Sequence, residues 1–543
     1  MKGNMNLPLI LVVTVSLAPL VQSTNPRPHV IIMLADDLAF GDVSYHSNET
    51  NGAIETPNID ALADAGIKFE NYYVQPTCTP TRSQLMTARY QIHTGLMHGV
   101  IQPPQPSCIP LDEKLLPEYM KDYGYSTHMV GKWHLGMYKP ACRPTNRGFD
   151  SHYGILLGAG GYYSHTSSYY MKAEDVTFTG KDYRYTYSGV TDDEIQEEYD
   201  QNYTTTLYID RAKEIIDTYS GTSNSDISPL FLYVAFQTPH KPIEVPNSFV
   251  QPYNGGPLTG TRKQYAGLVG SLDYAVGEIV QKLKDVGIYD ESIIIFSTDN
   301  GGADQPSSNW PLRGAKHTLW EGGIRGVGFV TSPNFIPNCN VGSVKHDLVH
   351  VSDWLPTIVE GALQETVTPP TNKSLDGVNV WNYISKCKVK RTLRRELLHN
   401  IDPFYLQGRI KDSDYVNGVL QTPATFDTSI HAALRVGDMK IMTGEQGSMD
   451  RTPPPESGLA TPVETLNQTQ SVRLFNIADD PYEETDLSTT ADPALFQSML
   501  DKLADYWESS DRVAILYPQY ETEADPETDG YWRPWRNDDE SLI

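Results

Sequence analysis

The chain lacks the features of a membrane protein and of a protein that binds nucleic acid. Its 42 Lys and Arg against 68 Asp and Glu give a formal net charge of −26, which argues against non-specific nucleic-acid binding. Beyond the first residues, no apolar run approaches the length of a membrane span. The sequence contains no internal repeat, and its last residues, Glu540-Ser-Leu-Ile543, form no retention signal. We therefore expect a globular protein that draws any anionic substrate to a local basic site.

The strongly apolar stretch of the chain lies at its N-terminus. Lys2 precedes an apolar run from Leu7 to Leu20, and Val21-Gln-Ser23 has the small residues of a cleavage site. The run is too short for a membrane anchor, and the pattern predicts a secretory signal peptide over residues 1–23. A short N-terminal helix is the alternative. Passage through the secretory pathway, to a lysosome or out of the cell, also agrees with four glycosylation sequons, at Asn48, Asn202, Asn372 and Asn467.

Cysteine is scarce, and the number of cysteines is odd. Five cysteines in a secreted chain leave one unpaired if the others form disulfides. The pairings that are local in sequence join Cys108 to Cys142 and Cys339 to Cys387, although sequence alone does not fix the connectivity. These pairings would leave Cys78 free.

Most of the chain has the pattern of an α/β domain. Short continuous apolar runs, typical of strands buried on both faces, occupy His29–Ala35, Tyr125–Val130, Leu230–Phe236 and Ser292–Ser297. Helical patterns lie between them, over residues 58–65, 115–123, 207–219 and 265–285. Strands that alternate with helices predict a largely parallel sheet, and we expect this domain over residues 24–395.

After about residue 395 the pattern changes to short segments separated by turns. Segments 432–436, 439–442 and 473–477 predict a small antiparallel sheet, and a helix is expected over residues 494–509. The tail from residue 517 is acidic and rich in Trp, so it either packs across the body or stays partly loose. We expect a C-terminal subdomain over residues 396–543.

Hard oxygen ligands follow two of the predicted strands. Asp36 and Asp37 follow the first strand, and Asp299 and Asn300 follow the last. Ligands of parallel sheets gather beyond the carboxyl ends of the strands, and adjacent buried carboxylates repel each other unless a cation joins them. All-oxygen ligation favours Ca²⁺ or Mg²⁺ over Zn²⁺. Either pair alone is as well explained by a turn or an N-cap, but both together favour a metal site.

Candidate cations come from three other segments. Lys132 and His134 flank Trp133, so in an extended chain they point the same way. His240 follows the third predicted strand, and Lys316 lies in the Gly- and Trp-rich loop 310–323. Each taken singly is also explained as a surface or turn residue. Together they could bind an anionic ester and protonate a leaving group.

Cys78 opens a stretch that is compatible with a helix. Pro80 suits a first helical turn, and the N–H groups and dipole of such a terminus favour an anion. Arg82 lies one turn further on and can reach the same anion. A buried structural cysteine beside a helix cap is the alternative. A nucleophile, a helix N-terminus and an arginine form a candidate site for a tetrahedral oxyanion.

Two of these stretches resemble the signatures of the type I sulfatases: Cys78-Thr-Pro-Thr-Arg-Ser-Gln-Leu-Met-Thr-Ala-Arg89 and Gly131-Lys-Trp-His-Leu-Gly136. Further stretches, including Phe296–Gly302 and Leu397–Pro403, resemble the N-acetylgalactosamine-4-sulfatase (arylsulfatase B) branch of that family. The residues beside Lys316, Ala315 and His317, depart from the pattern of that branch. The resemblance implies an alkaline-phosphatase-like fold. This is a large mixed, mostly parallel sheet flanked by helices, with a smaller C-terminal domain that holds an antiparallel sheet and a helix.

The resemblance also implies a cofactor and a modification. The formylglycine-generating enzyme would convert Cys78 to Cα-formylglycine during maturation, and the hydrate of this residue would supply the nucleophile. The thiol itself would not do the chemistry. One calcium ion would be bound by residue 78 together with Asp36, Asp37, Asp299 and Asn300.

The implied reaction is hydrolysis of a sulfate ester in an aryl sulfate or a sulfated sugar, with N-acetylgalactosamine 4-sulfate units of dermatan or chondroitin sulfate as the expected substrate. Asp299 would act as base during attack on sulfur, and His240 and Lys316 would assist the departing alcohol. His134 would then accept a proton as sulfate leaves. Arg82 and Lys132 would hold the oxygens of the hydrate.

Two other functions are compatible with the same fold. A phosphatase or phosphodiesterase would ordinarily use Ser or Thr as its nucleophile with two zinc ions, whereas this chain offers Cys78 and few suitable histidines. A non-catalytic secreted binding or matrix protein is the other alternative, although every expected catalytic position is occupied.

Overall fold

The computed structural model describes residues 27–47, 53–171, 175–190, 194–221, 227–370, 373–405, 415–416, 419–462, 466–467, 469–516, 518–526 and 530–539. The predicted signal peptide and the sequons at Asn48 and Asn372 lie outside these residues. Within them, no helix has both the length and the apolar character needed to cross a membrane.

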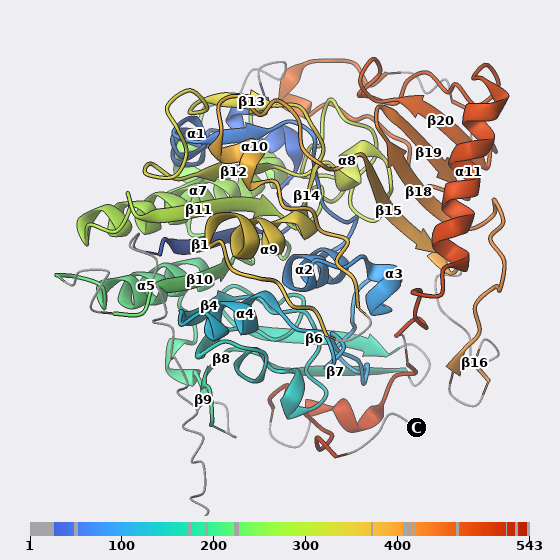
Figure 1. Ribbon diagram of the computed structural model, residues 1–543. Coiled ribbons are helices and arrows are strands. Elements are labelled where there is room, and N and C mark those ends of the chain that lie inside the picture. The colour runs from blue at the N-terminus through green and yellow to red at the C-terminus, as the bar shows by residue number, and fades with distance from the viewer. Residues whose placement is uncertain are drawn as a thin grey trace, which may run out of the picture.

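A ten-stranded sheet runs through the larger part of the molecule, in the order β13-β2-β12-β11-β1-β10-β4-β5-β8-β9 (Figure 1). Its parallel centre consists of β11 (Ser292–Thr298), β1 (His29–Ala35), β10 (Leu230–Ala235), β4 (Ser126–Gly131) and β5 (Ser151–Gly154). The flanking strands are β12 (Gly328–Thr331), β2 (Ile67–Phe69), β13 (Ser343–Lys345), β8 (Arg184–Tyr187) and β9 (Glu194–Ile195). The four strands expected from apolar runs are present within one residue of their predicted ends.

Helices cover both faces of this sheet, which explains the continuous apolar strands. Val30, Ile32 and Leu34 of β1 share a core with α2 (Cys78–Thr87), α4 (Leu116–Asp122) and α9 (Trp354–Pro356). The alternate β1 residues share a second core with α1 (Pro57–Asp64), α5 (Thr204–Asp217) and α7 (Gly260–Asp285). Every residue of β1 is therefore buried.

A second, antiparallel sheet has the order β15-β18-β19-β20. It contains β15 (Glu396–Asp402), β18 (His431–Val436), β19 (Met439–Thr443) and β20 (Val472–Asn476), and α11 (Pro493–Glu508) packs beside it (Figure 1). The predicted architecture is thereby confirmed. The sequence did not predict β15, because a register shift between Leu398 and Asn400 interrupts the alternation of its side chains.

The remaining strands and α-helices are short. They are β3 (Tyr72–Tyr73), β14 (Val349–His350), β6 (Thr166–Met171), β7 (Val176–Lys181), β16 (Tyr415–Val416), β17 (Val419–Leu420), α3 (Gln91–Thr94), α6 (Asn247–Val250), α8 (Glu321–Ile324) and α10 (Trp381–Ser385). The described part of the C-terminal tail packs on the body, since Trp532 is fully buried and its Nε1 donates to the Ser167 carbonyl oxygen at 3.0 Å.

Both disulfides that are local in sequence are present. Cys108 is bonded to Cys142 and Cys339 to Cys387, with Cα–Cα distances of 6.0 and 5.9 Å. Cys78 is free and buried.

Candidate active site

Most of the predicted site residues follow the carboxyl ends of four neighbouring parallel strands, β11, β1, β10 and β4 (Figure 1). Parallel neighbours end at the same edge of a sheet, so residues from distant parts of the sequence meet there. Asp36 and Asp37 follow β1, and Asp299 and Asn300 follow β11. Lys132 and His134 follow β4, His240 follows β10, Cys78 begins α2, and Lys316 lies in the loop before α8.

Three carboxylates and a thiol form the buried centre of the site. One atom from each of Asp36, Asp37, Cys78 and Asp299 lies within 4.8 Å of the others, and all four residues are buried. Asn300 joins them, because its Nδ2 donates to Asp37 Oδ1 at 2.7 Å. Its Oδ1 is buried without a hydrogen-bond partner. An unpartnered amide oxygen beside three carboxylates is a donor set that fits a hard cation.

Two lysines pair with Asp36 and Asp37. Lys132 Nζ lies 2.6 Å from Asp36 Oδ2, and Lys316 Nζ lies 2.6 Å from Asp37 Oδ1. The same ammonium groups lie 3.4 and 3.5 Å from Cys78 Sγ. Residue 78 therefore carries its reactive atom between two positive charges, where an anionic group would be stabilised.

Arg82 holds Asp299 in place. Its Nη2 and Nε donate to Asp299 Oδ2 at 2.9 and 3.2 Å, and its Nη1 donates to the Lys132 carbonyl oxygen at 2.9 Å. The guanidinium is fully buried. One turn of α2 thus connects the acid that follows β11 with the segment that follows β4.

The carboxyl groups of the site titrate differently. Burial, reinforced by the charge of Asp299, raises the pKa of Asp36 to about 7 despite Lys132. Burial also acts against ionisation of Asp37, but Lys316 and His240 hold the pKa of that carboxyl below its usual value. Arg82 and Lys132 likewise outweigh burial and keep the pKa of Asp299 low. An ionised Asp299 is thereby favoured, and it is a weak proton acceptor.

The environment of Cys78 keeps its thiol protonated. Burial, together with the neighbouring charge of Asp299, raises the pKa of this thiol far above its usual value, even though Lys132 and Lys316 act in the opposite direction. The thiolate is the nucleophilic form of cysteine. An unmodified Cys78 is therefore a poor nucleophile in this position.

Both histidines of the site are neutral. Burial lowers the pKa of His240 to about 3, with Asp37 opposing and Lys316 reinforcing the effect. Its Nε2 lies 3.6 Å from Asp37 Oδ2. Burial and the charge of Lys132 also push the pKa of His134 well below its usual value, and its Nδ1 is buried without a partner. His134 can accept a proton, because its imidazole is uncharged.

Two site residues have strained backbones. Asp37 has φ 62° and His134 has φ 55°, in the left-handed region that non-glycine residues rarely adopt. Such strain costs of order 1–3 kcal/mol per residue and concentrates at functional sites. At Asp37 and His134 the left-handed backbone changes the direction of the chain directly after β1 and β4.

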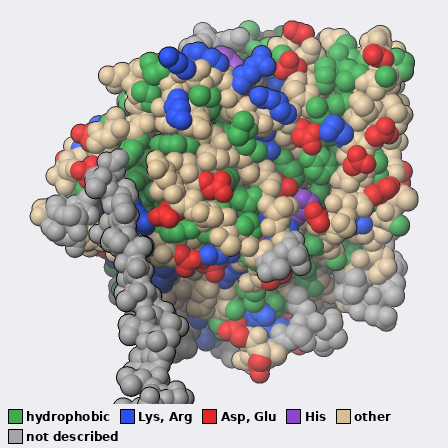
Figure 2. All heavy atoms as spheres, viewed as in Figure 1, with side chains coloured by type: hydrophobic (Ala, Val, Ile, Leu, Met, Phe, Trp, Pro, Cys, Tyr) green, Lys and Arg blue, Asp and Glu red, His purple; other side chains and the backbone are tan. Residues whose placement is uncertain are grey.

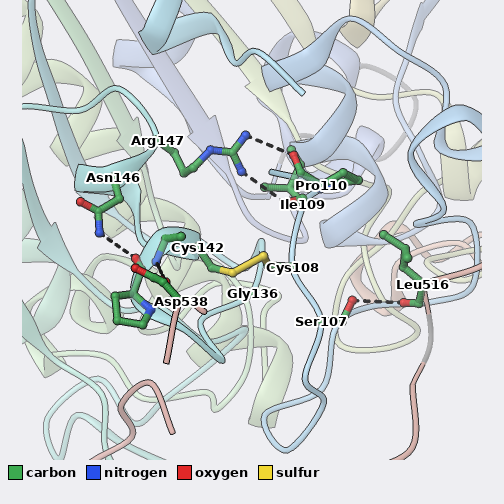
Figure 3. Close-up of a disulfide and its surroundings, with 12 residues drawn as sticks. Ser107, Cys108, Ile109, Pro110, Gly136, Cys142, Asn146, Arg147, Leu516 and Asp538 are labelled. Carbon is green, nitrogen blue, oxygen red and sulfur yellow. Dashed lines mark hydrogen bonds between the residues drawn. A yellow bond between two sulfur atoms is a disulfide. The ribbon is translucent and has the colours of Figure 1, made fainter. Parts of the chain in front are cut away.

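Neighbouring glycines and a disulfide support His134. Its Nε2 lies 3.2 Å from the Ile101 carbonyl oxygen, and a Cβ at Gly158 would come within 2.5 Å of its ring. Gly136, at φ +90°, approaches the Cys108–Cys142 disulfide so closely that a Cβ there would lie 2.4 Å from Cys108. Figure 3 shows this disulfide and Arg147, which donates to the carbonyl oxygens of Ile109 and Pro110 at 3.2 and 3.3 Å.

Asn309 is a positioning residue that the sequence did not single out. Its Oδ1 accepts from the Gly302 amide, and its Nδ2 donates to the Gly302 carbonyl oxygen, both at 2.9 Å. The same carbonyl oxygen accepts from the Lys316 amide at 3.0 Å. Asn309 therefore joins the segment that follows Asp299 and Asn300 to the loop that carries Lys316. In the sequence, Asn309 begins the stretch Asn309-Trp-Pro-Leu-Arg-Gly314, which leads into the loop of Lys316, and this position was the one indication of its role.

The structure brings the predicted catalytic and metal residues into one contact network, with His134 at its edge and in contact with Ile101. The sequons at Asn202 and Asn467 lie elsewhere, and both asparagines are exposed.

Comparisons with known proteins indicate the family to which the chain is similar. Residues 28–362 match the family model described as Sulfatase. Arylsulfatase J of Mus musculus is 42% identical over 523 residues, covering 94% of this chain and 80% of that protein. N-acetylgalactosamine-6-sulfatase of Sus scrofa is 30% identical over 366 residues, covering 65% of each protein. The crystal structure of Ps i-CgsB in complex with k-i-k-neocarrahexaose superposes with a TM-score of 0.69 at 26% identity, covering 91% of this chain and 95% of that one. These similarities do not single out the N-acetylgalactosamine-4-sulfatase branch.

Proposed function

This chain belongs to the sulfatase family, and on that premise we propose that it hydrolyses the 4-sulfate esters of N-acetylgalactosamine units in dermatan or chondroitin sulfate. The observation that carries the proposal is the position of residue 78. Its side chain lies at the N-terminus of α2, between the ammonium groups of Lys132 and Lys316 and beside a cluster of buried carboxylates. This arrangement suits an anionic ester and a nucleophile in contact with it.

The nucleophile in this proposal is a modified residue 78. The protonated, buried thiol is unsuited to attack, so we propose conversion of Cys78 to Cα-formylglycine by the formylglycine-generating enzyme during maturation. A hydrated aldehyde has two hydroxyl groups, so one can attack sulfur while the other later allows sulfate to leave by elimination. A serine in this position would remain as a stable sulfate ester.

A single calcium ion is the proposed metal. The ligands would be residue 78, Asp36, Asp37, Asp299 and Asn300, and the unpartnered Oδ1 of Asn300 supports this assignment. When bound, the ion would add positive charge that offsets the three carboxylates and attracts sulfate oxygens.

The side chains have distinct proposed roles. Lys132 and Arg82 hold residue 78 and Asp299 in position, and Asp299 is the proposed base for the attacking hydroxyl, although Arg82 weakens it. Lys316 and His240 assist the departing alcohol, with Lys316 as the permanent cation. His134, uncharged and with an unpartnered Nδ1, accepts the proton of the second hydroxyl.

We propose that the protein is secreted or lysosomal. Residues 1–23 would be removed as a signal peptide, leaving a catalytic domain over residues 24–395 and a C-terminal subdomain over residues 396–543. Exposure of Asn202 and Asn467 in the described part of the chain supports glycosylation at these two sequons.

Hydrolysis of an aryl sulfate by the secreted protein and by its Cys78→Ala variant tests the reaction. We expect turnover in the parent, none in the variant, and little turnover of the matching aryl phosphate by either. Activity that survives in Cys78→Ala, or a preference for the phosphate ester, would overturn the proposed chemistry. Sulfate release from N-acetylgalactosamine 4-sulfate and 6-sulfate then tests the substrate, and release from the 6-sulfate alone would refute the 4-sulfate assignment.

A further inference from the structure

A compact basic patch lies between α10 and β15, away from the residues assigned to catalysis. Five exposed cations make up this basic patch: Lys386, Lys388, Lys390, Arg391 and Arg395. None of the five forms an ion pair with a carboxylate of the described residues. Figure 2 shows Lys and Arg side chains gathered on this face, over β13 and α10.

The basic patch is unusual in a protein of this charge. The chain carries a net charge of −26, yet five exposed cations fall within ten consecutive residues. Lys390 also lies near the buried Lys345, because burial and then the charge of Lys390 lower the pKa of Lys345, while Asp347 acts in the opposite direction. Unneutralised like charges repel at this range, so a surface of this kind attracts an anion.

The segment that carries the basic patch is held firmly. Cys387 is bonded to Cys339, and the Thr392 amide donates to Asp347 Oδ2 at 2.8 Å. Arg394, the buried cation of the same run, donates through Nε to Asp353 Oδ2 at 3.0 Å. Because these anchors fix the backbone, a ligand of the exposed cations would meet a preformed surface at little cost in chain ordering.

The topology places the basic patch at the same edge of the sheet as the candidate active site. β13 is parallel to β2, β2 is antiparallel to β12, and β12 is antiparallel to β11, so β13 ends at the edge where β1 and β11 end. Thr392 contacts Asp347 and Leu348, directly beyond the end of β13. Four strand spacings separate β13 from β1, which is about 19 Å across the sheet.

We propose that the basic patch binds a sulfated glycosaminoglycan chain at a site separate from the catalytic centre. The choice of this polyanion rests on the proposed function, whereas the existence of an anion-binding surface does not. A narrow, flexible polyanion can contact the basic patch alone. An extended anionic surface such as a membrane would also face the negative remainder of the protein, beyond a Debye length of about 8 Å at physiological salt.

Binding of polymeric chondroitin sulfate to the full chain tests this proposal. The Cys78→Ala background prevents consumption of the polymer, and the variant Lys390→Glu/Arg391→Glu reverses two charges of the basic patch. The control variant is Lys263→Glu/Lys284→Glu. It changes the net charge by the same amount, but in α7, outside the basic patch. We expect about tenfold weaker binding in the patch variant at 0.15 M salt, and less than about twofold change in the control.

Three results would overturn the proposal. They are equal weakening in both double variants, unchanged binding in the patch variant, and patch-dependent binding to phosphatidylserine vesicles without binding to the polysaccharide. Both double substitutions should also be made in the protein that retains Cys78. Their turnover of a small aryl sulfate should equal that of the parent, which would show that the variants fold correctly. Patch-dependent binding by a protein that turns over no sulfate ester would refute the proposed reaction and leave the binding site standing.

Discussion

Two buried clusters of charge in this molecule have opposite characters. The site cluster contains Asp36, Asp37, Asp299, Arg82, Lys132 and Lys316. The clamp cluster contains Glu321, Glu483, Arg325, Arg435 and Lys440, and it joins α8 of the larger part to β18 and β19 of the antiparallel sheet. Each cluster is almost completely removed from water, so each must satisfy its charges internally.

The clamp cluster achieves this fully. Lys440 Nζ lies 2.9 Å from Glu321 Oε1 and 2.7 Å from Glu483 Oε1, and Arg325 Nε donates to Glu321 Oε2 at 2.7 Å. Glu483 Oε2 accepts from the Glu321 amide at 2.8 Å. No charged side-chain atom of this cluster lacks a partner among the described residues, although the ring nitrogens of the adjacent His399 are buried without one. It fixes the end of the loop that carries Lys316.

The site cluster remains incomplete. Its six charged side chains have partners among the described residues, but the Oδ1 of Asn300, which is hydrogen-bonded to Asp37, and the Nδ1 of the neighbouring His134 are buried without partners, and the backbone of Asp37 is strained. A buried polar network that is complete stabilises the fold, whereas unpartnered atoms and strain mark a place for a ligand. Comparison of the two clusters therefore separates a structural role from a functional one.

Removal of the central cation of the clamp cluster should have the largest effect on stability. Lys440→Met leaves Glu321 and Glu483 buried together, and we expect the free energy of unfolding to fall by about 3–5 kcal/mol. Denaturant unfolding measures this change. Lys345→Met is the control, because the Lys345 ammonium donates to the amide oxygen of Asn340 rather than to a carboxylate, and it should cost about 1–2 kcal/mol. A Lys440→Met variant as stable as the parent protein would show that the clamp cluster is dispensable.

The corresponding change in the site cluster should affect activity instead. Lys316→Met removes the cation shared by Asp37 and residue 78, so kcat for an aryl sulfate should fall by about 10²–10³-fold. Its free energy of unfolding should change by much less than that of Lys440→Met. A variant with near-parental kcat would exclude Lys316 from the chemistry.

The prediction of the fold from sequence succeeded where a segment carried its own signal. The strands β1, β10 and β11 are apolar throughout because helices cover both faces, and the acids at their ends follow from the same pattern. β15 and the clamp cluster carry no such local signal. Glu321 and Lys440 are separated by 119 residues and Lys440 and Glu483 by 43, so only the folded chain reveals that they meet. The sequence likewise does not fix which cation this set of donors would hold.

The site cluster should also make stability depend on pH in the absence of metal. Burial raises the pKa of Asp36 to about 7, so the folded protein binds this proton more tightly than the unfolded chain does. The resulting stabilisation is complete below the ordinary pKa of a carboxyl group and is lost as pH rises through about 7. In chelator at pH 8, Asp36→Asn should therefore be more stable than the parent by about 1–2 kcal/mol. The difference should shrink as pH falls and disappear below about pH 4, where Asp36 is protonated in both the folded and the unfolded state. A destabilised variant at pH 8 would contradict this account.

The smallest expected effect concerns the clamp cluster. Burial, followed by the charge of Glu321 and opposed by Lys440, raises the pKa of Glu483 to about 7. Stability from this proton is present at pH 4.5 and is lost as pH rises through about 7. Glu483→Gln should remove about 1 kcal/mol of this pH dependence, with or without calcium. Unfolding curves of the parent and of Glu483→Gln across pH 5–8 would measure this effect. If the difference between the two proteins changed when calcium was added, the pH dependence would belong to the site cluster and not to the clamp cluster.

Calcium binding by the intact protein tests the central distinction most directly. Titration calorimetry and elemental analysis at pH 7.5 would compare the parent, Glu483→Gln and the variant Asp37→Ala/Asn300→Ala. The account predicts one calcium ion per chain in the parent and in Glu483→Gln, and none in the variant of the site cluster. A parent without bound calcium, or equal binding by all three proteins, would contradict the assignment of the incomplete cluster as the metal centre.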